Sequence, residues 1–272
     1  MKRVDIWVLL LSVFLLTGCG HYYKNSHLKH SDQSSGYRFP LPAETGEQDK
    51  LFVALSFSGG GTRAAALSYG VLSKLQEIRM GRNDGALRLL DEVDVISSVS
   101  GGSFTSAYYG LFGERIFKDY KERFLYRDLQ GELAIELFKP WNWMRLASPY
   151  YSRIDMAAEF YDRTIFDGAL FQTLVDRGRR PYVAMNATNM TTGDRFTFTQ
   201  EEFDLIGSDL AAFPVARAVA ASSAFPFLLS PVSLVNNEAA ENYELAMDMQ
   251  NALKEDDLQS NPRTANMRCL FR

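Results

Sequence analysis

The chain contains the stretch LFVALSFSGGGTRAAALSYGVLSKLQEI at residues 51–78, in which three different patterns follow one another without a spacer. The apolar run 51–57 has the length of a buried strand, and it is closed by Ser58 and three glycines. Apolar residues then recur at helical spacing, which predicts a helix over 64–78. A strand, a glycine turn and a helix in this order are typical of an α/β sheet.

The same order of elements recurs in the next part of the chain. Residues 93–98 predict a second buried strand, and a helix is expected over 103–111 after Gly101 and Gly102. Two such units in succession favour parallel strands, because a helical crossover returns the chain to the start of the next strand. Further strands are expected at 182–186 and 195–199, and a further helix at 215–223.

The composition is that of an ordinary globular protein. The chain has 272 residues, 46% of them hydrophobic, which is enough for one sizeable domain and excludes a disordered chain. Its formal net charge is −4 and charges of both signs are mixed, so nucleic acid is not expected as a partner. The two cysteines, Cys19 and Cys269, are too few for a disulfide framework or a zinc site.

The N-terminus has the pattern of an export signal. A short basic start precedes the apolar run 6–16, which is too short to span a bilayer comfortably. The following Leu16-Thr17-Gly18-Cys19 resembles the lipobox of bacterial lipoproteins, in which the cysteine carries lipid. We expect a signal peptide over 1–18 and a lipidated N-terminus with a flexible tether over 19–50. Gly20 after the cysteine favours the outer membrane of the bacterial envelope over the inner membrane.

A candidate nucleophile follows the second expected strand. Residues 98–102, Ser98-Val99-Ser100-Gly101-Gly102, have the form of a nucleophile elbow, a strained turn that projects its central serine above the edge of a sheet. Ser98 stands where the first glycine of Gly-x-Ser-x-Gly is expected, a tolerable change because serine is also small. On this motif alone, a flexible loop of serine and glycine remains an equal alternative.

The first glycine turn supplies candidate oxyanion donors. Gly59, Gly60 and Gly61 stand at the start of an expected helix, where backbone N–H groups converge and favour a developing negative charge. Arg63 adds a fixed positive charge beside them. A P-loop is disfavoured because no Gly-Lys-Ser/Thr follows, and Ala64 replaces the last glycine of a dinucleotide fingerprint. A plain tight turn remains the alternative.

Histidine is confined to the N-terminal region of the sequence, at His21, His27 and His30. A Ser-His-Asp triad requires an imidazole beside the nucleophile, and these three belong to the expected tether. A serine hydrolase built on this sequence therefore needs another base, and an aspartate paired directly with serine is the leading option.

Three motifs together resemble the patatin-like phospholipase family over about residues 51–234. They are the glycine stretch 56–64, the elbow 98–103, and the segment 220–226 (AASSAFP) with Ser230-Pro231-Val232. The glycine stretch with its arginine also resembles the cytosolic phospholipases A2. The resemblance implies a three-layer α/β/α fold with a mainly parallel central sheet, and an attack by Ser100 on lipid or other acyl esters. It implies an oxyanion site at Gly60 and Gly61 and no metal or other cofactor.

One element of the family pattern has no match in the expected place. The family carries an Asp-Gly-Gly or Asp-Gly-Ala turn, whose aspartate is the base, after the segment 220–226, whereas the last glycine of this sequence is Gly207. Asp167-Gly168-Ala169 has the right letters in the wrong order along the chain, so we interpret it as a turn before a helix. Asp248 lies in a helical pattern without a glycine turn and is a weaker candidate.

Two functions therefore follow from the sequence. The first is a membrane-anchored lipid acyl hydrolase with a Ser-Asp dyad, with the fold incomplete at its C-terminal end and the aspartate missing. The second is a noncatalytic envelope lipoprotein that keeps the fold for binding lipid or protein. We expect the hydrolase domain over 51–235, and a helical segment with an atypical end over 236–272.

Overall fold

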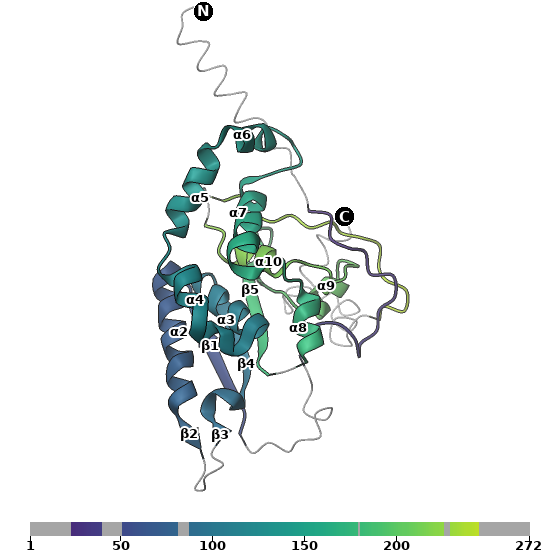
Figure 1. Cartoon of the computed structure of the whole chain (residues 1–272). Coiled ribbons are helices and arrows are strands. Elements are labelled where there is room, and N and C mark those ends of the chain that lie inside the picture. The colour runs from purple at the N-terminus through teal and green to yellow at the C-terminus, as the bar shows by residue number, and fades with distance from the viewer. Residues whose placement is uncertain (1–22, 40–50, 81–86, 179, 226–228, 245–272) are drawn as a thin grey trace, which may run out of the picture.

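The structure is a computed structural model that describes residues 23–39, 51–80, 87–178, 180–225 and 229–244 (Figure 1). Its main sheet has four strands in the order β1-β4-β5-β6. The strands are β1 (Val53–Phe57), β4 (Val93–Val99), β5 (Tyr182–Thr188) and β6 (Arg195–Thr197). The first three run parallel and β6 runs antiparallel to β5. The expected α/β class with a mainly parallel sheet is therefore confirmed, and each of these strands lies within three residues of its predicted bounds.

Helices flank the sheet and surround the central helix α3. The longer helices are α2 (Gly61–Glu77), α3 (Gly101–Phe112), α5 (Leu129–Phe138), α6 (Pro140–Leu146), α7 (Arg153–Tyr161), α8 (Phe171–Arg177) and α10 (Val215–Ser222). Shorter ones are η1 (Leu89–Glu92), η2 (Gly113–Arg115), α4 (Ile116–Tyr120), η3 (Lys121–Leu125), η4 (Asp162–Phe166) and α9 (Gln200–Asp204). The helices expected after the two glycine turns and at 215–223 are confirmed.

The parallel strands all point toward the same end of the molecule. A small hairpin of β2 (Arg79–Met80) and β3 (Leu87–Arg88) leads through η1 into β4, so it marks the end where β4 starts (Figure 1). The helices α5 and α6 lie at the opposite end, beyond the start of α2 (Figure 1). The turns that follow β1 and β4 therefore lie at the end of the sheet that faces α5 and α6.

The core is rich in aromatic side chains packed around α3. One group stacks Phe104 against Phe124 and places Tyr161 edge-on to it, with ring centroids 4.6 and 4.9 Å from that of Phe104. Nine successive residues of α3, from Gly101 to Tyr109, are buried. Burial of this kind is the main source of stability in a domain of this size, so the start of α3 is held firmly against the sheet.

Residues 23–39 differ from the tether expected over 19–50, because they pack on the domain. Tyr37 is buried, its hydroxyl donates to the carbonyl of Val183, and its ring stacks on Tyr182 at 4.6 Å. Arg38 forms an ion pair of 2.6 Å with Asp204. Single aromatic and charged side chains hold this extended segment in place, and they leave no periodic pattern in the sequence.

The expected C-terminal helix does not begin before residue 245. Residues 236–244 contain no helix, and Glu241 instead bridges to His30, whose ring nitrogen lies 2.9 Å from the glutamate carboxylate. Glu241 and the carbonyl of Glu238 thus contact the N-terminal segment, and Asn237 bonds to Ser208. The predictions for Cys19, Asp248 and Cys269 lie outside the described residues. In the described ranges, no helix is long and apolar enough to cross a membrane.

Candidate active site

The two glycine turns meet because β1 and β4 are neighbours in the sheet. Phe57, the last residue of β1, is paired with Ser98 near the end of β4. A Cβ atom added to Gly59 would lie 3.3 Å from the Cβ of Ser100 and 3.9 Å from its Oγ. The carboxyl ends of parallel strands share one edge, where α/β proteins place their sites. The predicted oxyanion turn therefore lies directly beside the predicted nucleophile.

Ser100 has the backbone of a strained elbow. Its φ of 52° and ψ of −119° lie in a region that residues other than glycine rarely adopt, and it is the residue before the first turn of α3. Such an outlier costs on the order of 1–3 kcal/mol and persists only where its surroundings impose it. Within the described part of the chain, the Ser100 hydroxyl has no hydrogen-bond partner, so it remains available for chemistry.

The two glycines after Ser100 are required by close backbone contacts. A Cβ atom at Gly101 would lie 2.1 Å from the carbonyl oxygen of Gly61, and one at Gly102 would lie 2.7 Å from that of Phe57. Both distances are far below van der Waals contact. Any side chain at these positions would therefore separate the elbow from the glycine turn.

Ser98 and Ser103 are buried and form part of a hydroxyl network. Ser98 is only 1% exposed, its Oγ accepts hydrogen bonds of 2.7 Å from Ser106 and 3.2 Å from Ser103, and Ser103 is fully buried. The substitution of serine for the first elbow glycine thus places a hydroxyl in the core beneath the turn. Neither side chain is accessible to a substrate, and Ser100 is the serine of the elbow with a half-exposed position.

The side chain of Ser222 holds the backbone of Ser100, a role that the sequence did not reveal. Ser222 Oγ accepts a hydrogen bond of 2.8 Å from the Ser100 N–H and donates one of 2.6 Å to the carbonyl of Asn186 on β5. Ser222 is the last residue of α10 and belongs to the third sequence motif, AASSAFP. That segment was visible as part of the family pattern, but which of its serines faces the elbow depends on how α10 packs.

The glycine turn presents a positive electrostatic environment. Gly60 and Gly61 have φ values of 138° and 64°, and α2 starts at Gly61 with no acidic residue in its first turn. Arg63 is exposed and forms no ion pair within the described residues. The N–H groups at the start of a helix lack intrahelical partners and carry partial positive charge. The N-terminal ends of α2 and α3 lie beside Ser100, so they would stabilise the negative charge of an oxyanion formed there.

Asp167 lies away from the elbow, in the turn before α8. Its carboxylate accepts hydrogen bonds of 3.1 Å from Arg115 and 2.9 Å from Arg123. Burial raises the pKa of Asp167, but the hydrogen bonds from the two arginines outweigh it and leave the pKa below its ordinary value. A lowered pKa is the opposite of what a general base requires.

The position of Asp167 relative to α10 also separates it from Ser100. The carbonyl of nearby Ala169 accepts a hydrogen bond of 3.0 Å from Val215, the first residue of α10, whereas Ser222 contacts Ser100 at the last residue of that helix. Eight helical residues rise by about 12 Å. The structure thus agrees with the interpretation of residues 167–169 as a turn before a helix.

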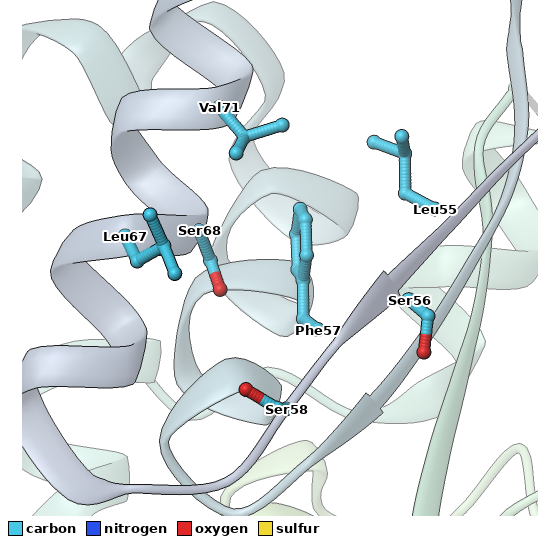
Figure 2. A pocket seen from close by; sticks show the side chains of 7 residues that line it. All are labelled: Leu55, Ser56, Phe57, Ser58, Leu67, Ser68 and Val71. Atoms are coloured by element: carbon cyan, nitrogen blue, oxygen red, sulfur yellow. The ribbon is translucent and has the colours of Figure 1, made fainter.

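A small cavity of about 130 Å³ lies between β1 and α2 (Figure 2). Leu55 and Phe57 from β1 face Leu67 and Val71 from α2 across it, with Ser58 near the start of the glycine turn (Figure 2). Sites for small molecules usually measure about 300–1,000 Å³. This cavity borders the candidate site but is too small to hold a lipid.

Comparison with known families assigns the chain. A family model described as "Patatin-like phospholipase" matches residues 55–248, which span the glycine turn, the elbow and Ser222. The chain belongs to this family. The mainly parallel sheet with flanking helices is the patatin-like α/β/α arrangement.

Among solved structures, the patatin-like chain is similar to a human phospholipase. That structure is human GIVD cytosolic phospholipase A2 in complex with the inhibitor methyl gamma-linolenyl fluorophosphonate and terbium chloride. The two are 21% identical with a TM-score of 0.39, and the match covers 65% of this chain and 30% of the human chain. No curated protein matches the chain.

In the described ranges, no group of three or more histidine, cysteine, aspartate or glutamate residues is placed to hold a metal ion.

Proposed function

We propose that this patatin-like chain is a membrane-anchored lipid acyl hydrolase of the phospholipase A, lysophospholipase or esterase type, with Ser100 as its nucleophile. The observation that carries the proposal is the strained backbone of Ser100 with its hydroxyl unpartnered among the described residues, next to Gly59 at the ends of two strands. Strain of this kind is maintained at functional sites. A plain Ser/Gly loop has no need of it.

The proposed reaction is acyl transfer in two steps. The Ser100 oxygen attacks the ester carbonyl while its proton passes to a base, and the carbonyl oxygen becomes an oxyanion held by the N–H groups of Gly60 and Gly61. The lipid alcohol then leaves with a proton, and water hydrolyses the acyl-enzyme to release the fatty acid and free Ser100. No step requires a metal or other cofactor.

The proposed Ser-Asp dyad also requires an aspartate as its general base. The sequence contains no Asp-Gly turn after Gly207, where the family carries this residue. No described carboxylate is hydrogen-bonded to the Ser100 hydroxyl. The described residues thus supply the nucleophile and the oxyanion donors. Proton abstraction is the step to be tested directly.

We further propose that the protein is attached to the bacterial envelope, and to the outer membrane where one is present, through lipid on Cys19. The lipobox-like Leu16-Thr17-Gly18-Cys19 supports this proposal. Two or more acyl chains anchor a protein stably without a membrane-spanning segment. An enzyme anchored in this way stays at the membrane surface, where its lipid substrate is located.

The experiment is covalent labelling of the full chain with a fluorophosphonate probe, followed by turnover of a short-chain ester and of phosphatidylcholine. We expect slow labelling and turnover in the wild type, because no described carboxylate serves Ser100 as a base, and neither in Ser100→Ala, with circular dichroism showing that both are folded. A folded wild type that is neither labelled nor active would instead support the noncatalytic envelope lipoprotein. Labelling without turnover would place the defect after attack by the nucleophile.

A further inference from the structure

The helices α5 and α6 expose an unusual number of large apolar side chains. Although α5 has the apolar sequence LQGELAIELF, none of its residues is buried. The exposed fractions are 63% for Ile135, 72% for Phe138, 68% for Trp141, 59% for Trp143 and 63% for Met144. We call these five residues the aromatic arm. Large apolar side chains gathered on exposed helices are typical of an interaction site.

Internal hydrogen bonds keep α6 in place while its tryptophans face outward. The buried side chain of Asn142 donates a hydrogen bond of 2.7 Å to the carbonyl of Glu136, and the indole N–H of Trp143 donates one of 2.8 Å to the carbonyl of Leu137. Because that N–H is already paired, the ring of Trp143 can leave water without losing a hydrogen bond. The arm is thus preformed for an apolar environment.

The charges around the aromatic arm cancel. Residues 129–146 contain Glu132 and Glu136 and the two basic residues Lys139 and Arg145. Each carboxylate has a cationic partner: Arg127 pairs with Glu132, and Lys139 pairs with Glu136 at 2.8 Å. An anionic membrane is recognised by unpaired Lys and Arg, which this region lacks, whereas a zwitterionic surface requires only apolar and aromatic contact.

The arm lies at the same end of the molecule as the candidate site. Helix α2 starts beside Ser100 and runs toward β2, and α5 and α6 extend beyond its starting end (Figure 1). A flat surface that touches the arm therefore approaches the edge of the sheet that carries Ser100. The ten residues of α5 span only about 15 Å, so this helix lies in an interface rather than across a bilayer.

We propose that the aromatic arm inserts into the surface of a zwitterionic phospholipid bilayer and delivers the active-site edge to its lipid substrate. This inference rests on the proposed function for the identity of the substrate, but not for the binding itself. Tryptophan rings favour the boundary between head groups and acyl chains, and the buried apolar area supplies the affinity.

The tryptophans provide a direct readout of insertion. The sequence has three, and because Trp7 lies in the expected signal peptide, the chain from Cys19 onward reports on Trp141 and Trp143 of the arm alone. On addition of phosphatidylcholine vesicles, we expect its emission to shift to the blue, and brominated acyl chains to quench it. Emission that vesicles leave unchanged would overturn the proposal. A blue shift that instead follows protein concentration without lipid would also overturn it, in favour of a second copy of the chain as the occupant.

A pair of variants separates interfacial binding from catalysis. The double variant Phe138→Ser/Trp141→Ser should lower the rate on phosphatidylcholine vesicles by about a hundredfold or more, since each buried aromatic contributes about tenfold or more to binding. Its rate on a monomeric short-chain ester should stay that of the wild type. Leu87→Ser is the matched control, because Leu87 is 59% exposed on β3 at the opposite end of the molecule.

These measurements distinguish failure of the proposed membrane insertion from failure of the proposed hydrolase function. Equal losses on vesicles and on the soluble ester would show that the arm is structural and would overturn the inference. If the wild type hydrolyses neither substrate, the proposed function fails, while the tryptophan measurement still decides whether the arm inserts.

Discussion

The backbone N–H of Ser100 donates a hydrogen bond of 2.8 Å to the side-chain oxygen of Ser222. Because the O–H of the same side chain donates to the carbonyl of Asn186, one hydroxyl connects the elbow after β4 to the neighbouring strand β5. The N–H of Ser100 is therefore used to hold the turn and is not available to an oxyanion. The end of α10 thus sets the position of the proposed nucleophile.

We predict that Ser222→Ala slows the reaction of Ser100 without weakening lipid binding. The lost hydrogen bond, with a net value of about 0.5–1.5 kcal/mol, no longer favours the strained conformation, so the rate of fluorophosphonate labelling should fall by up to about tenfold. KM should stay unchanged. Ser223→Ala is the control, because among the described residues the Ser223 hydroxyl bonds only to carbonyls of its own helix. Equal effects of both changes would contradict the assigned role.

We predict that Ser98→Ala and Ser103→Ala keep activity while Ser100→Ala loses it by orders of magnitude. Ser98 and Ser103 are buried in the hydroxyl network, so removing either should lower the free energy of unfolding by about 1–3 kcal/mol. Urea denaturation and ester hydrolysis measure the two effects separately. Activity that survived in Ser100→Ala and disappeared in Ser98→Ala would assign the nucleophile to Ser98.

We predict that Asp167→Asn leaves the labelling rate unchanged. Asparagine tolerates the left-handed backbone of this position, where φ is 54°, so the change removes charge alone. The pKa of Asp167 is lowered in the folded protein, so its pairing with Arg115 and Arg123 stabilises the fold above an unfolded pKa of about 4. This contribution disappears as the pH falls through the folded pKa. Wild type and variant should therefore differ in urea midpoint at pH 7 and converge in acid.

We predict that Arg217→Met destabilises the domain strongly. Arg217 on α10 and Asp155 on α7 form a buried ion pair at 2.5 Å, and the guanidinium also lies 4.0 Å from the ring centre of Tyr23. Removing one partner leaves a buried charge, which costs about 3–5 kcal/mol in the free energy of unfolding. Since α10 also carries Ser222, urea denaturation should show the loss of stability together with slower labelling. An unchanged unfolding midpoint would contradict this account of the pair.

We predict that Cys19 carries lipid. Metabolic labelling with an acyl analogue should mark the wild-type chain and leave Cys19→Ala unlabelled, since the thiol is the acceptor in the lipobox pattern. Cys269→Ala is the control and should label like the wild type. Equal labelling of Cys19→Ala and the wild type would exclude this anchor.

The sequence by itself determined the features that depend on neighbours along the chain. Apolar runs of strand length, followed by glycines and helical spacing, predicted β1 with α2 and β4 with α3, since each pattern needs only the local backbone and one buried face. The choice of Ser100 followed for the same reason. The glycines on its far side mark the elbow in the sequence, and the structure requires them because a Cβ atom at Gly101 would lie 2.1 Å from the carbonyl oxygen of Gly61 in the neighbouring turn.

Only the tertiary structure decided which distant groups meet. It buried Tyr37 of the expected tether, selected Ser222 from two adjacent serines as the partner of Ser100, and left Trp141 exposed. It also paired Asp167 with two arginines away from the elbow. These outcomes depend on contacts between segments far apart in the chain, whose free energies come from packing and desolvation and leave no periodic signature in the residues themselves.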